Sequence, residues 1–210
     1  AYPYSINIES AHLPGSLVIR REVAFALLEN ICDEMGRHGL TKIVLLNGHG
    51  GNRFFLPLFV QTLPEKDKPY VAYYADLPYF PGAEEVLETE ETGHACEAET
   101  SLILHIHQEL VKMNQIPEPF TNLQRNLPLA QTGAYSPVDW YAMYPIMYVG
   151  DARKATTEKG RVIMDKLVEA LVSLLRAVKE DTVTPNLFQE FLAGSHKPAS
   201  PGLWKRSDSP

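Results

Sequence analysis

Cysteine and long apolar runs are both scarce in this chain. Its 210 residues include only two cysteines, Cys32 and Cys96, and their spacing matches neither a zinc finger nor a disulfide framework. This disfavours a disulfide-stapled secreted fold and predicts a reducing compartment, the cytoplasm. No apolar run approaches the roughly 20 residues that cross a bilayer, and no charged-then-apolar signal segment is present. We therefore expect a soluble protein with no membrane partner.

An excess of positive charge is also missing. The formal net charge is −7 and the isoelectric point is near 5.5, and the Lys and Arg residues are spread along the chain. These properties argue against a nucleic-acid partner and favour a small-molecule substrate. The glycine-rich loop at residues 47–52 lacks the patterns of P-loops and of dinucleotide-binding loops, which disfavours a phosphate cradle there.

The chain begins with Ala1, and no methionine precedes Met35, so we expect it to be a piece of a longer protein. Its length allows one sizeable α/β domain with an ample core, which we assign to residues 1–194. Structure is predicted to thin out from Pro185 onward. Residues 195–210 are accordingly predicted to form a mobile tail.

The segment KIVLLNGHGGN, residues 42–52, is the most informative part of the sequence. Residues 43–46 have the length and β-branched content of a buried strand, which ends in a loop with three glycines around His49. Glycines let the backbone adopt positive φ and approach a ligand, and open α/β sheets place their sites at the carboxyl ends of strands. His49 is therefore a candidate metal ligand. The alternative is an ordinary strand-to-helix turn in which His49 caps a neighbour.

The order of the predicted elements indicates the fold class. Residues 20–37 and 54–63 have helical patterns, and residues 70–76 predict a second strand. With the strand at residues 43–46, this alternation builds a parallel sheet with right-handed crossovers. We predict an α/β fold in which the two strands are parallel, and in which the first helix and a later one at residues 163–175 pack on the sheet.

A second informative segment is TGHACEAETS, residues 92–101, at the start of a predicted helix. If that helix begins at or just after His94, then His94 and Glu97 lie on one face. Glu99 then aligns with the apolar stripe of the helix and points toward the core, where a carboxylate is costly unless it is paired, hydrogen-bonded or bound to a metal. The stripe consists of Ile103, Ile106 and Leu110.

Three further residues are candidates for contact with a substrate. His12 precedes a Pro-Gly turn, where it either lines a pocket or is a solvated loop residue. Trp140 and Tyr141 either form flat apolar walls of a pocket or belong to an oligomer contact, because aromatic side chains are enriched in both.

Together, NGHGGN at a strand end and HACEAETS at a helix start resemble the creatininase (creatinine amidohydrolase) family. HLPGS at residues 12–16 looks like the histidine-then-PGT segment of that family. GDARKATTEKG at residues 150–160 is similar to its GD-x-x-x-AT-x-x-KG motif, in which Thr156 or Thr157 is a natural N-cap of a long amphipathic helix.

The resemblance implies a three-layer α/β/α fold with a mainly parallel sheet, assembled as a homo-oligomer. It also implies a two-metal site, with zinc, manganese or iron, that hydrolyses a small cyclic amide by metal-activated water. By this resemblance His49 is a metal ligand, Glu97 is the carboxylate ligand with Glu99 as the alternative, and His94 is the catalytic residue that transfers a proton.

The chain also departs from the family pattern. Cys96 stands where the family usually has glycine, and it is a ligand, a nucleophile or core filler. The upstream E-x-H-G-x-H-x-P segment that supplies further metal ligands in the family is absent from residues 1–210. Three functions stay open: a cyclic amide hydrolase, a hydrolase of a cyclic ketone or other ring, and a non-catalytic relative or fragment that has lost its metals. We expect His49 and Glu97 to converge, with His94 close by.

Overall fold

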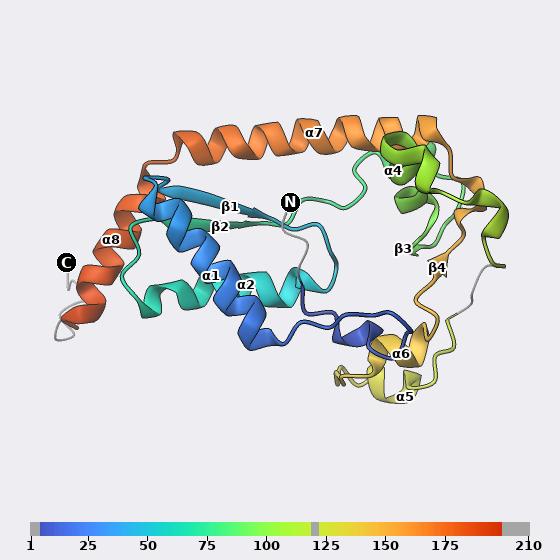
Figure 1. Ribbon diagram of the computed structural model, residues 1–210, viewed down its shortest axis with the longest axis horizontal. Coiled ribbons are helices and arrows are strands. Elements are labelled where there is room, and N and C mark those ends of the chain that lie inside the picture. The colour runs from blue at the N-terminus through green and yellow to red at the C-terminus, as the bar shows by residue number, and fades with distance from the viewer. Residues whose placement is uncertain (1–4, 119–121, 199–210) are drawn as a thin grey trace, which may run out of the picture. The chain divides into compact units, whose positions relative to one another are not determined.

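A computed structural model describes residues 5–118 and 122–198 of the chain (Figure 1). The chain divides into two compact units. Unit 1 contains residues 1–24 and 76–173, and unit 2 contains residues 25–75 and 174–210. Helices α1 and α7 each begin in unit 1 and end in unit 2, and each unit has its own two-stranded sheet.

Unit 2 is built on two parallel strands, β1 at Lys42–Leu46 and β2 at Val71–Ala75, which pair along their whole length. The apolar side chains of both strands supply core residues, among them Ile43, which is 2% exposed. Helix α2, Asn52–Thr62, lies between the strands in the chain and contacts β2. The predicted strand positions and their parallel pairing are confirmed, and so is the α/β class.

Aromatic packing joins the two helices at the start of unit 2. Phe25 of α1, Arg21–Arg37, meets Phe55 and Phe59 of α2 in edge-on contacts, with ring centroids 5.0 and 5.6 Å apart. Such contacts add to the free energy gained by burying the rings. Cys32 of α1 is also buried, and burial raises the pKa of its thiol to about 11, so it serves as a core side chain.

A buried ammonium group fixes α1 to the segment that leads into β2. Lys68 Nζ lies 2.7 Å from Glu29 Oε1 and 2.8 Å from Asp33 Oδ1. The Tyr70 hydroxyl donates a further hydrogen bond, 2.7 Å long, to the same oxygen of Asp33. Because the Lys68 side chain is only 4% exposed, its charge depends on these carboxylates.

The end of the described chain is helical, which corrects a sequence prediction. Helix α8, Val183–His196, contacts β2, and Asp181 caps it by accepting hydrogen bonds from the backbone N–H groups of the helix start. The Tyr73 hydroxyl of β2 donates to the same carboxylate over 2.9 Å. Structure therefore does not thin out at Pro185, because α8 is capped and tied to the sheet. The assigned tail begins inside α8, and residues 199–210 lie outside the described residues.

Unit 1 contains an antiparallel strand pair, β3 at Thr92–His94 and β4 at Val149–Gly150, and the helix α4 at Glu97–His107. The first part of α7, Thr157–Glu180, packs against α4. Three short helices complete the unit: α3 at Ala83–Val86, α5 at Leu127–Ala130 and α6 at Asp139–Met143. Single 3-10 turns of the two units lie at Ile8–Ser10, Leu63–Glu65, Gln108–Leu110, Met113–Gln115 and Ala152–Lys154.

The core of unit 1 forms where α4 meets α7. Cys96, Ala98 and Ile163 are each 0% exposed and belong to one cluster. Cys96 thus occupies a core position, which fits the filler interpretation. Ile163, predicted to start a helix segment that packs on the parallel strands, instead belongs to this cluster, because it packs against Cys96 and Ala98 at the start of α4.

Close approach between these two helices depends on Gly160 of α7. A Cβ atom at this position would lie 1.9 Å from the carbonyl oxygen of Ser101 in α4. The buried Ser101 hydroxyl accepts a hydrogen bond from Thr156 N over 3.1 Å. Thr156 in turn caps α7, since its hydroxyl oxygen accepts from Lys159 N, and the predicted N-cap is confirmed.

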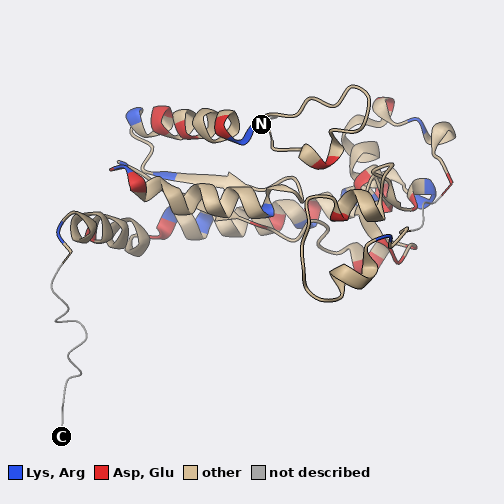
Figure 2. Ribbon diagram, turned by 90° about the horizontal axis from the view of Figure 1, so that it is seen from below, with Lys and Arg blue, Asp and Glu red and all other residues tan. Residues whose placement is uncertain are grey.

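Charged residues of both signs are spread over the helices of the described chain (Figure 2). Within α7, acidic and basic residues are interspersed. Among the described residues, no helix is both long enough and apolar enough to span a bilayer.

We predict that Gly160→Ala lowers stability although alanine is the better helix former. The added methyl group meets the Ser101 carbonyl and forces α4 and α7 apart, at a cost of roughly 1–3 kcal/mol. The matched control is Gly194→Ala in α8, where no atom lies within 4 Å of the added Cβ, and where a gain of up to about 1 kcal/mol is expected. Urea unfolding followed by circular dichroism measures both, and equal effects at the two glycines would refute the prediction.

Candidate functional site

His49 lies in unit 2, in the loop between β1 and α2. Asn47 N donates to the carbonyl oxygen of Ala75 over 2.9 Å, which extends the strand pairing by one residue. The Asn47 side chain then accepts a hydrogen bond of 3.1 Å from His49 N, and the His49 carbonyl accepts from Asn52 N at the start of α2. The backbone of His49 is therefore fixed at the carboxyl end of a strand, as the sequence predicts.

The glycines around His49 do not use the backbone freedom that was predicted for them. Positive φ angles occur at five described glycines, and Gly48, Gly50 and Gly51 are not among them. Gly51 has a helical φ of −63°. The prediction of a positive-φ loop is wrong because this loop leads directly into the first turn of α2.

His94 lies in unit 1 as the last residue of β3. Its Nδ1 atom makes a short hydrogen bond to the carbonyl oxygen of Met147. Because a carbonyl oxygen only accepts, Nδ1 carries the proton, and in the neutral ring the lone pair is on Nε2. The bond to the Met147 carbonyl also fixes the orientation of the ring. The Nε2 atom of His94 is therefore a proton acceptor in a defined position.

The backbone is strained on both sides of this hydrogen bond. Ala95 has a φ of 56° and Met147 a φ of 59°, a region that residues with a Cβ rarely adopt. Such conformations persist where the surrounding structure over-determines them, and they cluster at functional sites. Two of the three described non-glycine residues with positive φ therefore flank the His94 hydrogen bond, which supports the His94 turn as a candidate site.

The aromatic candidates gather around the segment that ends at Met147. Trp140 Nε1 lies 2.9 Å from the Met147 sulfur. His12 Nε2 donates to the Pro145 carbonyl over 2.6 Å, and the His12 ring meets Tyr141 edge-on with centroids 4.7 Å apart. The structure thus brings His12, Trp140 and Tyr141 to the same segment that holds His94.

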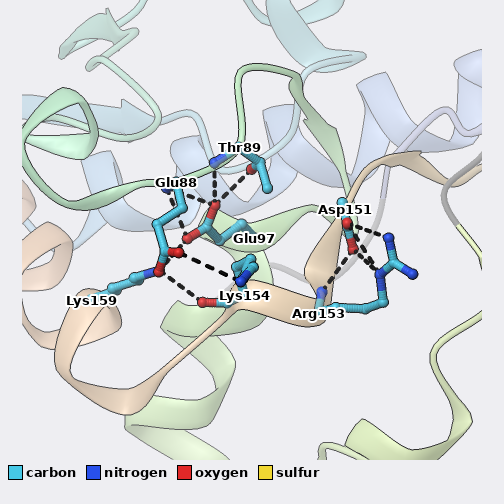
Figure 3. Close-up of polar contacts among 7 residues, drawn as sticks. All are labelled: Glu88, Thr89, Glu97, Asp151, Arg153, Lys154 and Lys159. Atoms are coloured by element: carbon cyan, nitrogen blue, oxygen red, sulfur yellow. Dashed lines mark hydrogen bonds and ion pairs between the residues drawn. The ribbon is translucent and has the colours of Figure 1, made fainter.

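Glu97, the predicted metal ligand, is fully buried in unit 1 and surrounded by hydrogen-bond donors (Figure 3). Its Oε1 accepts from Lys159 Nζ over 2.5 Å. Its Oε2 accepts from Thr89 N over 2.8 Å and from the Thr89 hydroxyl over 2.6 Å. Glu88 N donates to both oxygens, at 3.2 and 3.1 Å. The carboxylate therefore has an ammonium group and three further donors as neighbours.

These neighbours keep both charges in place. Burial acts to raise the pKa of Glu97, but hydrogen bonds from Lys159 and Thr89 outweigh it and lower the pKa below its ordinary value. Burial likewise acts to lower the pKa of Lys159, and hydrogen bonds to Glu88 and Glu97 raise it. Glu97 is a carboxylate and Lys159 an ammonium ion at neutral pH.

The faces of α4 differ from the prediction. The helix begins at Glu97, after His94, Ala95 and the N-cap Cys96, so His94 does not share a helix face with Glu97. The predicted core stripe is largely exposed, whereas the buried face includes Glu97, Ala98, Ser101 and Leu104. The stripe residues Ile103, Ile106 and Leu110 are 40%, 48% and 67% exposed. The apolar pattern predicted the wrong buried face, because the face that is buried carries two hydrogen-bonded polar side chains, Glu97 and Ser101.

The donor set of Glu97 does not fit a metal ion. Across residues 5–118 and 122–198, no three His, Cys, Asp or Glu side chains lie close enough together to hold one. An ammonium and a hydroxyl already occupy the positions that a cation would need. Glu99, the alternative ligand, is half-buried, and its Oε2 accepts from Ala95 N over 2.5 Å. The predicted convergence of His49 with Glu97 stays a prediction, because the two residues belong to different units.

Sequence reasoning missed Lys159, Thr89 and Met147. Lys159 was within reach of sequence analysis, because it is the lysine of the KG pair in the segment GDARKATTEKG. The role of Met147 could not be found in this way, since its contact with His94 is through a backbone carbonyl. Thr89 lies in the acidic segment that precedes β3, and so does Glu88, whose carboxylate pairs with Lys159.

The family model described as creatinine amidohydrolase matches residues 1–175. The chain belongs to the creatininase family. It is 26% identical over 195 residues to 3-dehydro-scyllo-inosose hydrolase from Thermotoga maritima, and 24% identical over 183 residues to creatinine amidohydrolase from Pseudomonas putida. These matches cover 80% and 79% of this creatininase-family chain, which spans 60% and 66% of the length of the two relatives.

Solved structures of creatininases share the fold. A protein from Bacteroides fragilis, described as a creatinine amidohydrolase, is 27% identical with a TM-score of 0.72, and the match covers 82% of this chain and 68% of that one. A mutant creatininase in complex with creatine is 22% identical with a TM-score of 0.58, covering 86% and 75%. The predicted creatininase-like fold is confirmed.

We predict that His94 and His12, whose rings each bond to a backbone carbonyl, are opposite neutral tautomers. His94 donates from Nδ1 and His12 donates from Nε2, each to a backbone carbonyl. Two-bond ¹H–¹⁵N correlation spectra at alkaline pH distinguish the tautomers by their ring nitrogen shifts. His107, an exposed histidine of α4, is the reference for a ring without such a carbonyl. The same tautomer at His94 and His12 would contradict the assignment.

Proposed function

We propose that this chain is part of a hydrolase that acts on a small cyclic amide. Membership of the creatininase family supports the proposal, as does the relative from Pseudomonas putida, a creatinine amidohydrolase. A structure of a related fold is a creatininase in complex with creatine. A small substrate also agrees with the acidic chain, whose basic residues are interspersed with acidic ones.

His94 is the residue to which we assign proton transfer, and its hydrogen bond to Met147 is the observation that carries the proposal. With Nδ1–H bound to a carbonyl, Nε2 takes a proton from the attacking water and passes it to the leaving nitrogen. The strained backbone at Ala95 and Met147 holds the ring in one orientation. His12, Trp140 and Tyr141 are proposed to line the substrate side of the same segment.

A divalent metal, zinc, manganese or iron, is proposed as the cofactor of the whole protein. His49 is the ligand that we assign to it in this chain, because the loop after β1 fixes its backbone at the strand end. The proposal draws support from the fold, which is shared with a mutant creatininase described as the Zn-Zn type. Glu97 is not given this role, since its donors do not fit a metal ion.

A hydrolase of a cyclic ketone is the second candidate. The relative from Thermotoga maritima is a 3-dehydro-scyllo-inosose hydrolase and is 26% identical. Both candidates use the same proton-transferring group, so they differ in the bond that is cleaved. Parallel assays with creatinine and with a cyclic polyol ketone separate them, and activity on neither substrate favours a non-catalytic relative.

We predict different consequences for the two histidines. His94→Ala lowers turnover by about 10²–10⁴-fold, the usual contribution of a positioned acid–base group, and leaves metal content unchanged. His49→Ala releases the metal and abolishes turnover. Steady-state kinetics and elemental analysis of the purified proteins measure these effects, with His107→Ala on the exposed face of α4 as the control. Loss of metal in His94→Ala would contradict the assignment of His94 to proton transfer rather than to metal binding.

The protein is further proposed to be a cytoplasmic homo-oligomer. Both cysteines are free and buried, which is compatible with a reducing compartment. Of the aromatic segment at residues 140–148, Tyr144 and Tyr148 are buried, whereas Tyr141 and Ile146 are 41% and 49% exposed. The proposed subunit contact therefore involves Ile146, because Tyr141 is already assigned to the substrate side.

We expect light scattering to give a mass above 23.5 kDa, the mass of one chain, at micromolar concentration. Ile146→Ser should shift the distribution toward the monomer, because apolar contact area is lost. Val183→Ser on exposed α8 is the control. A monomeric mass for the unaltered protein would refute the homo-oligomer.

A further inference from the structure

We propose that Glu97 and Lys159 form a permanent internal ion pair that positions the His94 turn, and that Glu97 is not a metal ligand. The positioning role rests on the proposed function of His94, whereas the ion pair itself does not. Glu97 and Lys159 are thus positioning residues, since neither contacts the reacting atoms in this assignment.

The hydrogen-bonding capacity of both charged groups is filled (Figure 3). An ammonium group has three donors, and Lys159 Nζ has three acceptors: Glu97 Oε1 at 2.5 Å, Glu88 Oε1 at 2.6 Å and the Lys154 carbonyl at 2.8 Å. A carboxylate has about four acceptor sites. Those of Glu97 are used by four donor groups, so a metal ion would have to displace at least one of them.

Helix packing delivers Lys159 to this position. Gly160 brings the backbone of α7 against Ser101 of α4, and Thr156 is bonded to the Ser101 hydroxyl. Lys159 therefore projects from the first turn of α7 beside the first residue of α4. Both contacts lie within unit 1, and the lysine side chain is only 12% exposed.

The Glu97 side chain closes a loop that contains His94. It accepts hydrogen bonds from residues 88 and 89, which precede β3, and it belongs to the first residue of α4, which follows the His94 turn. The residues from Thr89 to Glu97 are thereby held at both ends. Close packing of Gly93 against Val149 leaves this loop little room. The positive φ of Ala95 is maintained under this constraint.

The pair is also costly to break from one side. Removing one member of a buried pair leaves an uncompensated charge, whereas removing both charges together restores neutrality. Comparing the double variant with the two single variants therefore separates the effect of the ion pair from the effects of each residue alone. We use Glu97→Gln, Lys159→Met and their combination. Lys154→Met is the matched control, because Lys154 lies on the same segment and its Nζ only approaches Glu88, at 3.7 Å.

Two readouts are measured without any substrate. Amide hydrogen exchange of Thr89 reports the bond to Glu97, and ring ¹⁵N shifts report the His94 tautomer. We expect Lys159→Met to accelerate Thr89 exchange by on the order of tenfold and to reduce the Nδ1–H form of His94. Glu97→Gln should give a smaller change, because it keeps one acceptor oxygen. The double variant should recover the unaltered values more closely than Lys159→Met, and Lys154→Met should leave both unchanged.

Zinc alone is the probe for the competing assignment. We expect millimolar zinc to leave Thr89 exchange in the unaltered protein unchanged, because Glu97 keeps its donors. A zinc-induced acceleration that disappears in Glu97→Gln would overturn the proposal. An unchanged His94 tautomer in both folded single variants would overturn the positioning role. If Lys159→Met does not fold, Glu97→Gln and the double variant carry the same comparison. Failure of the creatinine assay would leave all these readouts intact.

Discussion

The need to neutralise a buried carboxylate organises unit 1. Glu97 has no exposed surface, and a carboxylate in such a place is tolerated only with full hydrogen bonding and a counter-ion. The start of α4, the segment before β3 and the first turn of α7 each supply part of this shell. The same constraint sets the position of Gly160, since Lys159 reaches Glu97 only if α7 approaches α4 closely. The His94 turn lies between the groups that this shell holds.

Much of the fold could be predicted from periodicity and order. The strand at residues 43–46, its parallel partner at residues 71–75 and the capped helix after Thr156 follow from local propensity and hydrophobic pattern, which act over a few residues. The faces of α4 could not be predicted in this way. Its buried face carries Glu97 and Ser101, and their partners Lys159 and Thr156 lie more than 50 residues away in the sequence.

The histidines of the candidate site could also be predicted from the sequence, whereas their hydrogen-bond partners could not. Histidine type and spacing indicated His49 and His94, and family motifs gave them roles. The opposite tautomers of His12 and His94 depend on two backbone carbonyls of one loop, Pro145 and Met147, which no side-chain pattern encodes. Glu97 was predicted to bind a metal because it is a carboxylate in a family motif, and its contacts with Lys159 and Thr89 could not be identified from the sequence pattern. A carboxylate is a metal ligand or an ion-pair partner according to which cation the fold places beside it.

The contact between Gly160 and Ser101 has an evolutionary consequence. Because the lysine at position 159 is useful only when the next residue lacks a side chain, the two positions cannot drift independently. A larger residue at position 160 would move the Lys159 ammonium away from Glu97. The Glu97 carboxylate would then be buried without its counter-ion and would destabilise the fold. Homologous chains are therefore expected to keep Glu97, Lys159 and Gly160 as a set or to replace all three together.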